Sequence, residues 1–237
     1  KKSKGYDQKI MLKIYKYLIY FLVPFIKLNL IIRIKKNKED RKRVNERFGI
    51  SIKSRPKGKL IWIHATSVGE FNSTTGLIKY LSKKNNILVT TSTLTAYNYC
   101  KQIFENKVIH QYAPIDHEPW VINFIKHWSP NLVIWIESDL WPNTLRIISK
   151  HKIPSILLNL RISPQSLNRW KLDKKSFSII LEYFDKVFAQ SKHDLLEIKK
   201  LTSKKIEFIG NLKLTSLSKK INKNKIKKIQ KNISNKK

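Results

Sequence analysis

The chain has 237 residues, of which 41% are hydrophobic; this proportion supports a packed core and excludes global disorder. A single cysteine, Cys100, excludes a disulfide framework and a cysteine metal cluster, and it fits a reducing compartment. The formal charge of +33 favours anionic partners such as nucleic acid, anionic lipid or a phosphorylated substrate. An AT-rich genome would also enrich lysine, so charge alone identifies no partner.

An apolar and aromatic segment runs from Ile10 to Ile34 and is interrupted by lysines. Its longest uncharged run, Tyr17–Ile26, has ten residues, whereas a straight transmembrane helix needs about 20 apolar residues. We therefore expect a helix that lies in one membrane leaflet or dips into it, with its lysines reaching toward the head groups. The alternatives are a cleaved signal peptide and an ordinary core helix.

A basic segment follows directly. Its cations are Arg33, Lys35, Lys36, Lys38, Arg41, Lys42, Arg43 and Arg47. A basic cluster beside an apolar helix attracts anionic head groups and stays on the cytoplasmic side of a membrane. Residues 1–48 are therefore expected to form a membrane-anchor helix with a basic segment behind it.

From Lys59 onward, apolar runs alternate with segments of helical length. The predicted strands are Leu60–His64, Ile87–Thr91, Val108–Tyr112, Leu132–Ile136, Ser155–Leu160, Val187–Gln190 and Ile206–Ile209. The predicted helices are Phe71–Lys83, Ala96–Glu105, Pro119–Trp128, Leu140–His151, Lys174–Phe184 and Lys192–Leu201. Because the strands are continuously apolar, both faces of the sheet must be buried, which predicts an α/β fold: a parallel sheet with helices on both faces. This domain is expected over 49–215, and residues 216–237 are expected to form a lysine-rich tail or truncated linker.

In an open parallel sheet, ligands bind at the carboxyl ends of the strands. After the first predicted strand, small residues including Ser67 and Gly69 allow a tight turn into the next helix. Glu70 then lies near a helix N-terminus, where the helix dipole favours a carboxylate. A carboxylate at a strand end is well placed to act as a general base. The alternative is that Glu70 simply caps the helix.

Two carboxylates, Glu137 and Asp139, follow the fourth predicted strand. Such a pair can position a substrate hydroxyl or shift the proton affinity of one member. For Asp139 we favour the alternative of helix capping, with Pro142 in the first turn of the helix. For Glu137, which is still at the strand end, a functional and a structural role both remain open.

Cationic candidates occur after two later strands. Arg161 can form paired hydrogen bonds to a phosphate, and Lys213 provides a point charge for an anionic group; a surface salt bridge is the alternative for each. His64 lies on a predicted strand and is expected to pack in the core. The sequence shows no dinucleotide or Walker-type phosphate loop and no cluster with the spacing of metal ligands, so no metal is expected.

These motifs also occur as an ordered set. They are Ile61–Glu70 (IWIHATSVGE), Val89–Thr93 (VTTST), Glu137–Asn143 (ESDLWPN), Asn159–Ser163 (NLRIS) and Gly210–Lys213 (GNLK). The set strongly resembles the N-terminal half of the 3-deoxy-D-manno-octulosonic acid (Kdo) transferases. The resemblance runs from about Met11 to Lys213 and includes the apolar segment, the basic segment and Glu46–Gly49.

The resemblance implies one half of a GT-B glycosyltransferase, in which two Rossmann-like domains face each other across a cleft. In that family the N-terminal domain binds lipid IVA, the lipid A precursor, and the C-terminal domain binds the donor CMP-Kdo. The reaction belongs to lipopolysaccharide biosynthesis and takes place at the cytoplasmic face of the inner membrane. The implied partners are therefore lipid IVA and the inner-membrane surface, and no cofactor is implied beyond the donor substrate.

The same resemblance assigns roles to individual residues. Glu70 matches the catalytic base, and Glu137 and Lys213 match two positions that stabilise the transition state. Lys213 would offset negative charge as the CMP phosphate departs. The substrate-binding candidates within the same motifs are Ser67, Gly69, Arg161 and Ser163.

The chain departs from the family pattern in three ways. Asp139 stands where the family usually has Glu, and Ser138 replaces a usual Thr. The donor-binding motifs that should follow Lys213 are absent. We therefore expect the chain alone to bind CMP-Kdo poorly and to be inactive without a donor-binding domain. It would then be half of a split enzyme with a separate donor-binding chain, a truncated gene product, or a fragment.

Two rival functions remain open on the sequence. One is a non-catalytic lipid-binding or partner subunit descended from the same domain. The other is a basic nucleic-acid-binding protein, which charge alone suggests. The apolar N-terminal segment and the lack of a nucleic-acid-binding motif argue against the second rival.

Overall fold

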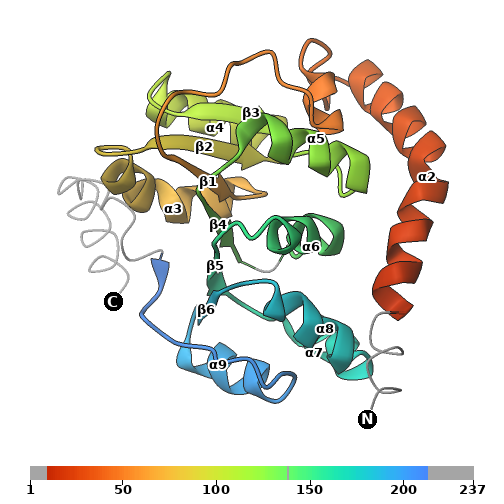
Figure 1. Ribbon diagram of the computed structural model, residues 1–237, viewed down its shortest axis with the longest axis vertical. Coiled ribbons are helices and arrows are strands. Elements are labelled where there is room, and N and C mark those ends of the chain that lie inside the picture. Colours follow the sequence, from red (N-terminus) through yellow and green to blue (C-terminus); the bar gives the residue numbers. More distant parts are fainter. Residues whose placement is uncertain (1–9, 138, 213–237) are drawn as a thin grey trace, which may run out of the picture.

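The computed structural model describes residues 10–137 and 139–212. Its centre is a six-stranded parallel sheet with the order β3-β2-β1-β4-β5-β6 (Figure 1). The strands are β1 (Leu60–His64), β2 (Asn86–Thr91), β3 (Ile109–Tyr112), β4 (Leu132–Ile136), β5 (Ser155–Leu160) and β6 (Lys186–Ala189). The strand order reverses beside β1, where the chain crosses to β4. Loops diverge at such a point and leave a crevice at the carboxyl ends of the strands.

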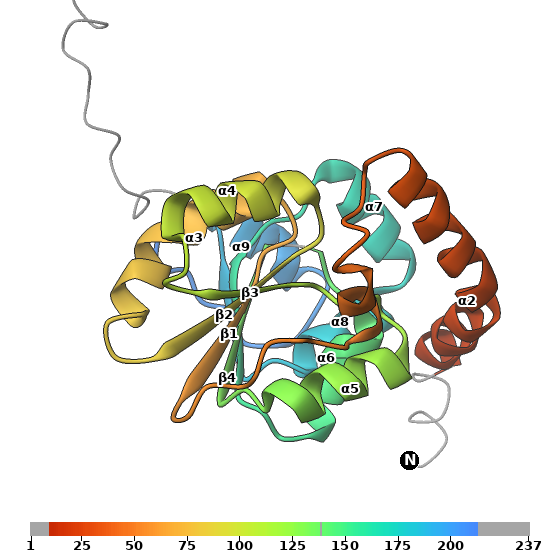
Figure 2. The same ribbon diagram turned by 90° about the horizontal axis from the view of Figure 1, so that it is seen from above.

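Helices cover both faces of this sheet. They are α3 (Val68–Leu81), α4 (Leu94–Phe104), α5 (Glu118–Trp128), α6 (Pro142–Lys150), α7 (Pro164–Leu172), α8 (Lys174–Glu182) and α9 (Lys192–Lys199). Helices α3 and α4 lie on one face, and α5, α6 and α8 lie on the other (Figure 2). Successive residues of β1 alternate between two buried cores, Leu60 and Trp62 in one and Ile61 and Ile63 in the other. The predicted Rossmann-like sheet with helices on both faces is confirmed.

Six of the seven predicted strands are confirmed, with ends that differ by one residue at most. The seventh, Ile206–Ile209, is wrong, because Glu207 forms only a single parallel bridge with Phe188. Phe208 and Ile209 are 37% and 68% exposed, so this run lacks the burial that a seventh strand of the parallel sheet would need.

Helix α7 was not among the predicted helices, although all six predicted ones are present. Ser163 caps α7 by accepting a hydrogen bond from the Ser166 N–H at 3.2 Å, and Pro164 occupies the first turn. The helix buries no residue completely, so its sequence lacks the apolar periodicity on which a helix prediction depends. The serine–proline pair is the start signal that could have located it.

The apolar segment forms one long helix, α2 (Ile10–Lys35), which lies along the side of the domain (Figure 1). By length and composition alone, α2 is long and apolar enough to cross a membrane. Only 6% of the apolar 18-residue stretch of α2 is buried inside the domain. The alternative that this segment is an ordinary core helix is therefore wrong. Its large exposed side chains include Met11, Ile14, Tyr17, Leu18, Phe21, Phe25, Leu28 and Ile31.

Polar and aromatic contacts attach α2 to the rest of the domain. The Tyr15 hydroxyl donates a hydrogen bond to Asp116 Oδ2 at 3.0 Å, and Lys16 Nζ lies 2.5 Å from a Glu118 carboxylate oxygen. The Tyr20 ring packs edge-on against His117, with 4.5 Å between ring centroids. All three contacts reach residues 116–118, at the start of α5, so one side of α2 is fixed while the other stays exposed.

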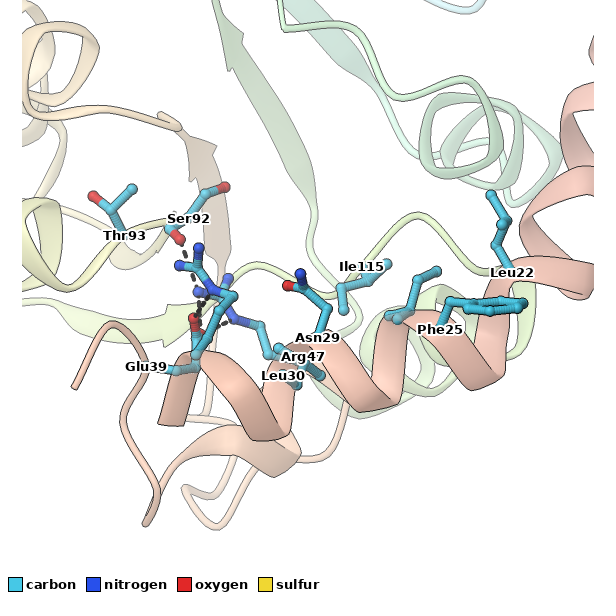
Figure 3. A pocket seen from close by; sticks show the side chains of 11 residues that line it. Leu22, Phe25, Asn29, Leu30, Glu39, Arg47, Ser92, Thr93 and Ile115 are labelled. Carbon is cyan, nitrogen blue, oxygen red and sulfur yellow. Dashed lines mark hydrogen bonds and ion pairs between the residues drawn. The ribbon is translucent and has the colours of Figure 1, made fainter. Parts of the chain in front are cut away.

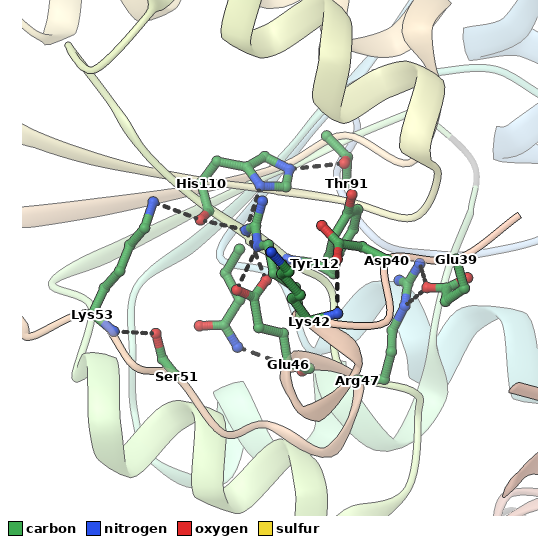
Figure 4. Close-up of polar contacts among 12 residues, drawn as sticks. Glu39, Asp40, Lys42, Glu46, Arg47, Ser51, Lys53, Thr91, His110 and Tyr112 are labelled. Carbon is green, nitrogen blue, oxygen red and sulfur yellow. Dashed lines mark hydrogen bonds and ion pairs between the residues drawn. The ribbon is translucent and has the colours of Figure 1, made fainter. Parts of the chain in front are cut away.

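The basic segment folds back onto the sheet and includes a 3₁₀ helix, η1 (Val44–Phe48). Arg47 is buried and pairs with Glu39 at 2.5 Å (Figure 4). It also donates to the Ser92 carbonyl at 2.7 Å. Glu46 accepts the Tyr112 N–H at 2.7 Å and pairs with Arg43 at 2.8 Å. Two of the cations that we expected to face membrane head groups therefore serve to attach this segment to β2 and β3.

Gly49 ends η1 with a φ of +74° and lies against α5. A Cβ atom at this position would lie 1.9 Å from the Trp120 carbonyl oxygen, so only glycine allows the approach. The adjacent Phe48 ring packs edge-on against the Trp120 ring, with 4.9 Å between centroids. The Glu46–Gly49 motif thus packs against α5 and connects the basic segment to the domain.

Candidate active site

Glu70 lies in the first turn of α3, directly after the carboxyl end of β1. Ser67 is the N-cap of this helix, and its hydroxyl accepts a hydrogen bond from the Glu70 N–H at 3.3 Å. The Glu70 carboxylate turns back toward the strand and accepts the Thr66 N–H at 2.6 Å. This reciprocal arrangement resembles a capping box and fixes the carboxylate at the rim of the sheet. The predicted position of Glu70 at the helix N-terminus is confirmed.

The surroundings of Glu70 favour its protonated form. Burial, with smaller contributions from the carboxylates of Glu137 and Asp139, raises the pKa of Glu70 from 4.5 to about 7. The hydrogen bond from Thr66 opposes this rise by stabilising the charged form. A carboxylate with a pKa close to neutral can accept a proton from a substrate and release it again, as a general base must.

Asp139 belongs to the same corner of the molecule. Its Oδ2 accepts a hydrogen bond from the Thr66 hydroxyl at 2.9 Å, so one threonine holds two carboxylates. The N-cap of α6 is Trp141, which makes no side-chain capping bond. The capping interpretation that the sequence favoured for Asp139 is therefore wrong, although Pro142 does begin the helix as expected.

Glu137 directly follows β4 and has a left-handed conformation, with a φ of +60°. Asn159, at the equivalent place in β5, has a φ of +61° and donates its amide to Glu137 Oε1 at 3.3 Å. Backbone strain of this kind persists where the surrounding structure enforces it, often at functional sites. The Asn159 side chain also accepts the Leu212 N–H at 3.3 Å. Lys213, the third proposed catalytic residue, lies outside the described residues.

The substrate-binding candidates fall into two groups. Ser67 and Gly69 adjoin Glu70, and a Cβ atom on Gly69 would meet only the Ser67 hydroxyl at 3.9 Å, so there is open space above this turn. Ser163 caps α7, and Arg161 is exposed. Both line a separate hollow of about 500 Å³ that His193 also lines and Glu70 does not. The structure therefore brings the first pair to the corner that holds Glu70 and the second pair to a neighbouring hollow.

Thr66 is the functional residue that sequence reasoning missed. Besides its two carboxylate contacts, its hydroxyl lies 3.3 Å from His64 Nε2. Burial lowers the pKa of His64 to about 3, so this ring is neutral and packed, as expected, against Trp135 and Trp141. The only signal in the sequence was a hydroxyl residue placed between the strand and the cap of the next helix.

Comparison with known proteins gives one family. A family model described as "3-Deoxy-D-manno-octulosonic-acid transferase (kdotransferase)" matches residues 42–216. A 3-deoxy-D-manno-octulosonic acid transferase of Rickettsia bellii is 33% identical over 95% of this chain and 54% of its own length. A probable mitochondrial 3-deoxy-D-manno-octulosonic acid transferase of Arabidopsis thaliana is 37% identical over 67% of this chain and 36% of its own length.

Among solved structures, a UDP-GlcNAc 2-epimerase from Neisseria meningitidis superimposes with a TM-score of 0.48 and 14% identity. The superposition covers 75% of this chain and 53% of the epimerase chain. The chain spans about half the length of the Rickettsia bellii relative, and a smaller share of the Arabidopsis thaliana one.

Proposed function

The chain belongs to the 3-deoxy-D-manno-octulosonic-acid transferase family, and from this premise we propose that it is the acceptor-binding half of a glycosyltransferase. The proposed reaction transfers Kdo from CMP-Kdo to lipid IVA during lipopolysaccharide biosynthesis. The observation that carries the proposal is the position of Glu70. It is a largely buried carboxylate with a pKa of about 7, at the carboxyl end of a parallel sheet and beside two further carboxylates.

In the proposed step, Glu70 takes the proton of the acceptor hydroxyl while that oxygen forms a bond to the anomeric carbon of Kdo. The bond between this carbon and the phosphate oxygen of CMP breaks, and CMP leaves with the electron pair. Glu137, held by Asn159, favours positive charge that develops on the sugar in the transition state. Lys213, which follows Leu212 in the family motif, is proposed to offset negative charge on the departing phosphate.

The proposed location is the cytoplasmic face of the inner membrane. A lipid acceptor stays in its bilayer, so the enzyme must reach it there. The exposed apolar side of α2 can enter the membrane, and the exposed lysines after it, Lys35, Lys36 and Lys38, can contact anionic head groups. The donor CMP-Kdo is proposed to bind the C-terminal domain of a two-domain family member.

The test is a reconstitution in vesicles that contain lipid IVA. The full chain is combined with a separately produced donor-binding half of a family member, and transfer of radiolabelled Kdo from CMP-Kdo to lipid is measured. Transfer is expected only when both halves are present. Lipid IVA binding without transfer would instead favour the non-catalytic lipid-binding subunit. Failure to bind lipid IVA at all would contradict both functions.

A further inference from the structure

A groove of about 600 Å³ separates α2 from the carboxyl ends of β2 and β3 (Figure 3). Its size lies within the range of about 300–1,000 Å³ that is common for small-ligand sites. One wall is the inner face of α2, where residues recur at helical spacing. The α2 wall carries Leu22, Phe25, Ile26 and Leu30 together with the polar Asn29, and Ile115 lies across from the helix. Phe25 is 60% exposed and lies at the open edge, so the groove is a mostly apolar channel that begins beside the exposed side of α2.

The other end of the groove is polar. Ser92 and Thr93 line it, and they lie directly after β2. The Ser92 hydroxyl is buried and has no hydrogen-bond partner among the described residues. A buried hydroxyl without a partner destabilises the fold, so its persistence points to a ligand group or water that it can bind. The channel thus joins apolar walls to an unused hydrogen-bonding group.

The polar end leads to the catalytic corner. The Ser92 N–H donates to the Thr66 carbonyl at 3.2 Å, and the Thr66 N–H donates to Glu70 at 2.6 Å. Thr66 thus links Ser92, at the end of the groove, to the proposed base through one backbone hydrogen bond and one bond from its N–H to the carboxylate. A molecule whose apolar part fills the groove would have its polar part beside Glu70.

The charges at the rim match an anionic amphiphile. Arg33 and Arg47 share the single carboxylate of Glu39, at 3.1 Å and 2.5 Å, and all three residues line the groove. Two guanidinium groups on one carboxylate leave a net positive charge at this point. Exposed lysines continue the positive charge beyond Arg33 along the end of α2 and the turn after it. An acyl chain attached to a phosphorylated head group satisfies both the apolar channel and the basic rim.

We propose that this groove holds one acyl chain of the acceptor lipid, with the Ser92 hydroxyl donating to the carbonyl that joins the chain to the sugar. The inference rests on the proposed function, because it takes lipid IVA as the acceptor. Holding one chain in the groove orients the head group and carries its hydroxyl toward Glu70. The bilayer then supplies the substrate from the side of α2.

The first experiment maps the chain by cross-linking. The full chain in vesicles is exposed to lipid IVA that carries a diazirine at the end of one acyl chain, and labelled residues are identified by mass spectrometry. Label is expected at Ile115, which lies across the groove from α2. A phosphatidylethanolamine with the same diazirine serves as the control and should label outward residues such as Tyr17 and Phe21 but not Ile115. If lipid IVA labels only those outward residues, the proposal that the groove holds an acyl chain is overturned. The proposed function would be unaffected by that result.

The second experiment blocks the groove. Ile26→Trp should reduce binding of lipid IVA at least tenfold and remove the label from Ile115, while partition of the chain into plain vesicles stays the same. Ile52→Trp is the matched control, because Ile52 is 91% exposed and lies outside the groove. Binding of the deacylated, phosphorylated sugar should be equal in both variants. Unchanged lipid IVA binding in a folded Ile26→Trp variant would overturn the proposal, whereas absence of binding in the unmodified chain would contradict the proposed function itself.

The third experiment removes the unpartnered hydroxyl. Ser92→Ala should weaken lipid IVA binding about fivefold, the value of one ordinary hydrogen bond. It should not lower the unfolding temperature of the free chain and should raise it slightly, because no protein partner is lost and an unpartnered buried hydroxyl is removed. Because this substitution is small, it still tests the groove if the Ile26→Trp variant fails to fold. Equal binding by Ser92→Ala and the unmodified chain would remove Ser92 from the site.

Discussion

Two groups of buried carboxylates lie on either side of Ser92, and they have opposite surroundings. Glu39 and Glu46 are the more deeply buried pair, with 6% and 4% of their surface exposed. Each has an arginine partner, Arg47 or Arg43, at 2.5–2.8 Å. Glu70 is less buried, and its charged neighbours are two further carboxylates; burial and, to a smaller extent, these carboxylates raise its pKa to about 7.

The difference shows that burial alone does not create a reactive carboxylate. A buried carboxylate beside an arginine forms an ion pair that joins two parts of the chain. A carboxylate that shares its site with like charges, and receives only a backbone N–H, can exchange its proton near neutral pH. The first group is therefore expected to govern stability and the second to govern reactivity.

The largest effect is expected on transfer in Glu70→Gln. Loss of a general base typically lowers a rate about 10²–10⁴-fold, and the amide keeps the shape and can still accept the Thr66 N–H. The measurement is Kdo transfer to lipid IVA in vesicles with a donor-binding half present. Glu105→Gln is the matched control, since Glu105 is exposed at the end of α4. Full transfer by a folded Glu70→Gln variant would remove Glu70 from the role of base.

The next effect is expected on stability in Arg47→Met. Removing one member of a buried ion pair costs about 3–5 kcal/mol, because Glu39 and the Ser92 carbonyl lose their donor. Denaturant unfolding measures the change. Lys205→Met is the control, since the pair of Lys205 with Glu207 is exposed and a surface pair contributes at most about 1 kcal/mol. Equal losses in the two variants would contradict the structural role of the first group.

The fold could be predicted from the sequence to a large extent. Continuous apolar runs located all six strands, because a doubly covered parallel strand needs apolar residues on both sides. The small residues after the first strand, including Gly69, located the turn that places Glu70 at the start of α3. The contact between Thr66 and Asp139 could not be predicted, because it joins side chains 73 positions apart that meet only when β1 and β4 pair. For the same reason, Arg47 was interpreted as a membrane cation rather than as the partner of Glu39 and Ser92.

A smaller effect is expected in the pH dependence of stability. The folded pKa of Glu70, about 7, exceeds its ordinary value of 4.5, so the folded chain holds a proton that the unfolded chain has released between these values. Its contribution is fully present below pH 4.5 and is lost as pH rises through 7. The amide of Glu70→Gln does not titrate, so this variant keeps its stability as pH rises. At pH 8 its free energy of unfolding should exceed that of the unmodified chain by up to about 3 kcal/mol. At pH 4.5 the two free energies should be about equal. Denaturant unfolding at both pH values checks the sign, and an advantage confined to acid pH would contradict it.

The smallest effect is expected from Asp139→Asn. The asparagine oxygen can still accept the Thr66 hydroxyl, so the geometry is kept, while one of the two negative charges that raise the pKa of Glu70 is removed. Because burial is the larger cause, the pH at which transfer reaches half its maximum should fall by less than about one unit, with little change in the maximal rate. Asp40→Asn, in the basic segment, should leave the profile unchanged. A loss of transfer at every pH would instead mean that Asp139 contacts the reacting atoms itself, and that the second group contains two catalytic carboxylates on either side of Thr66.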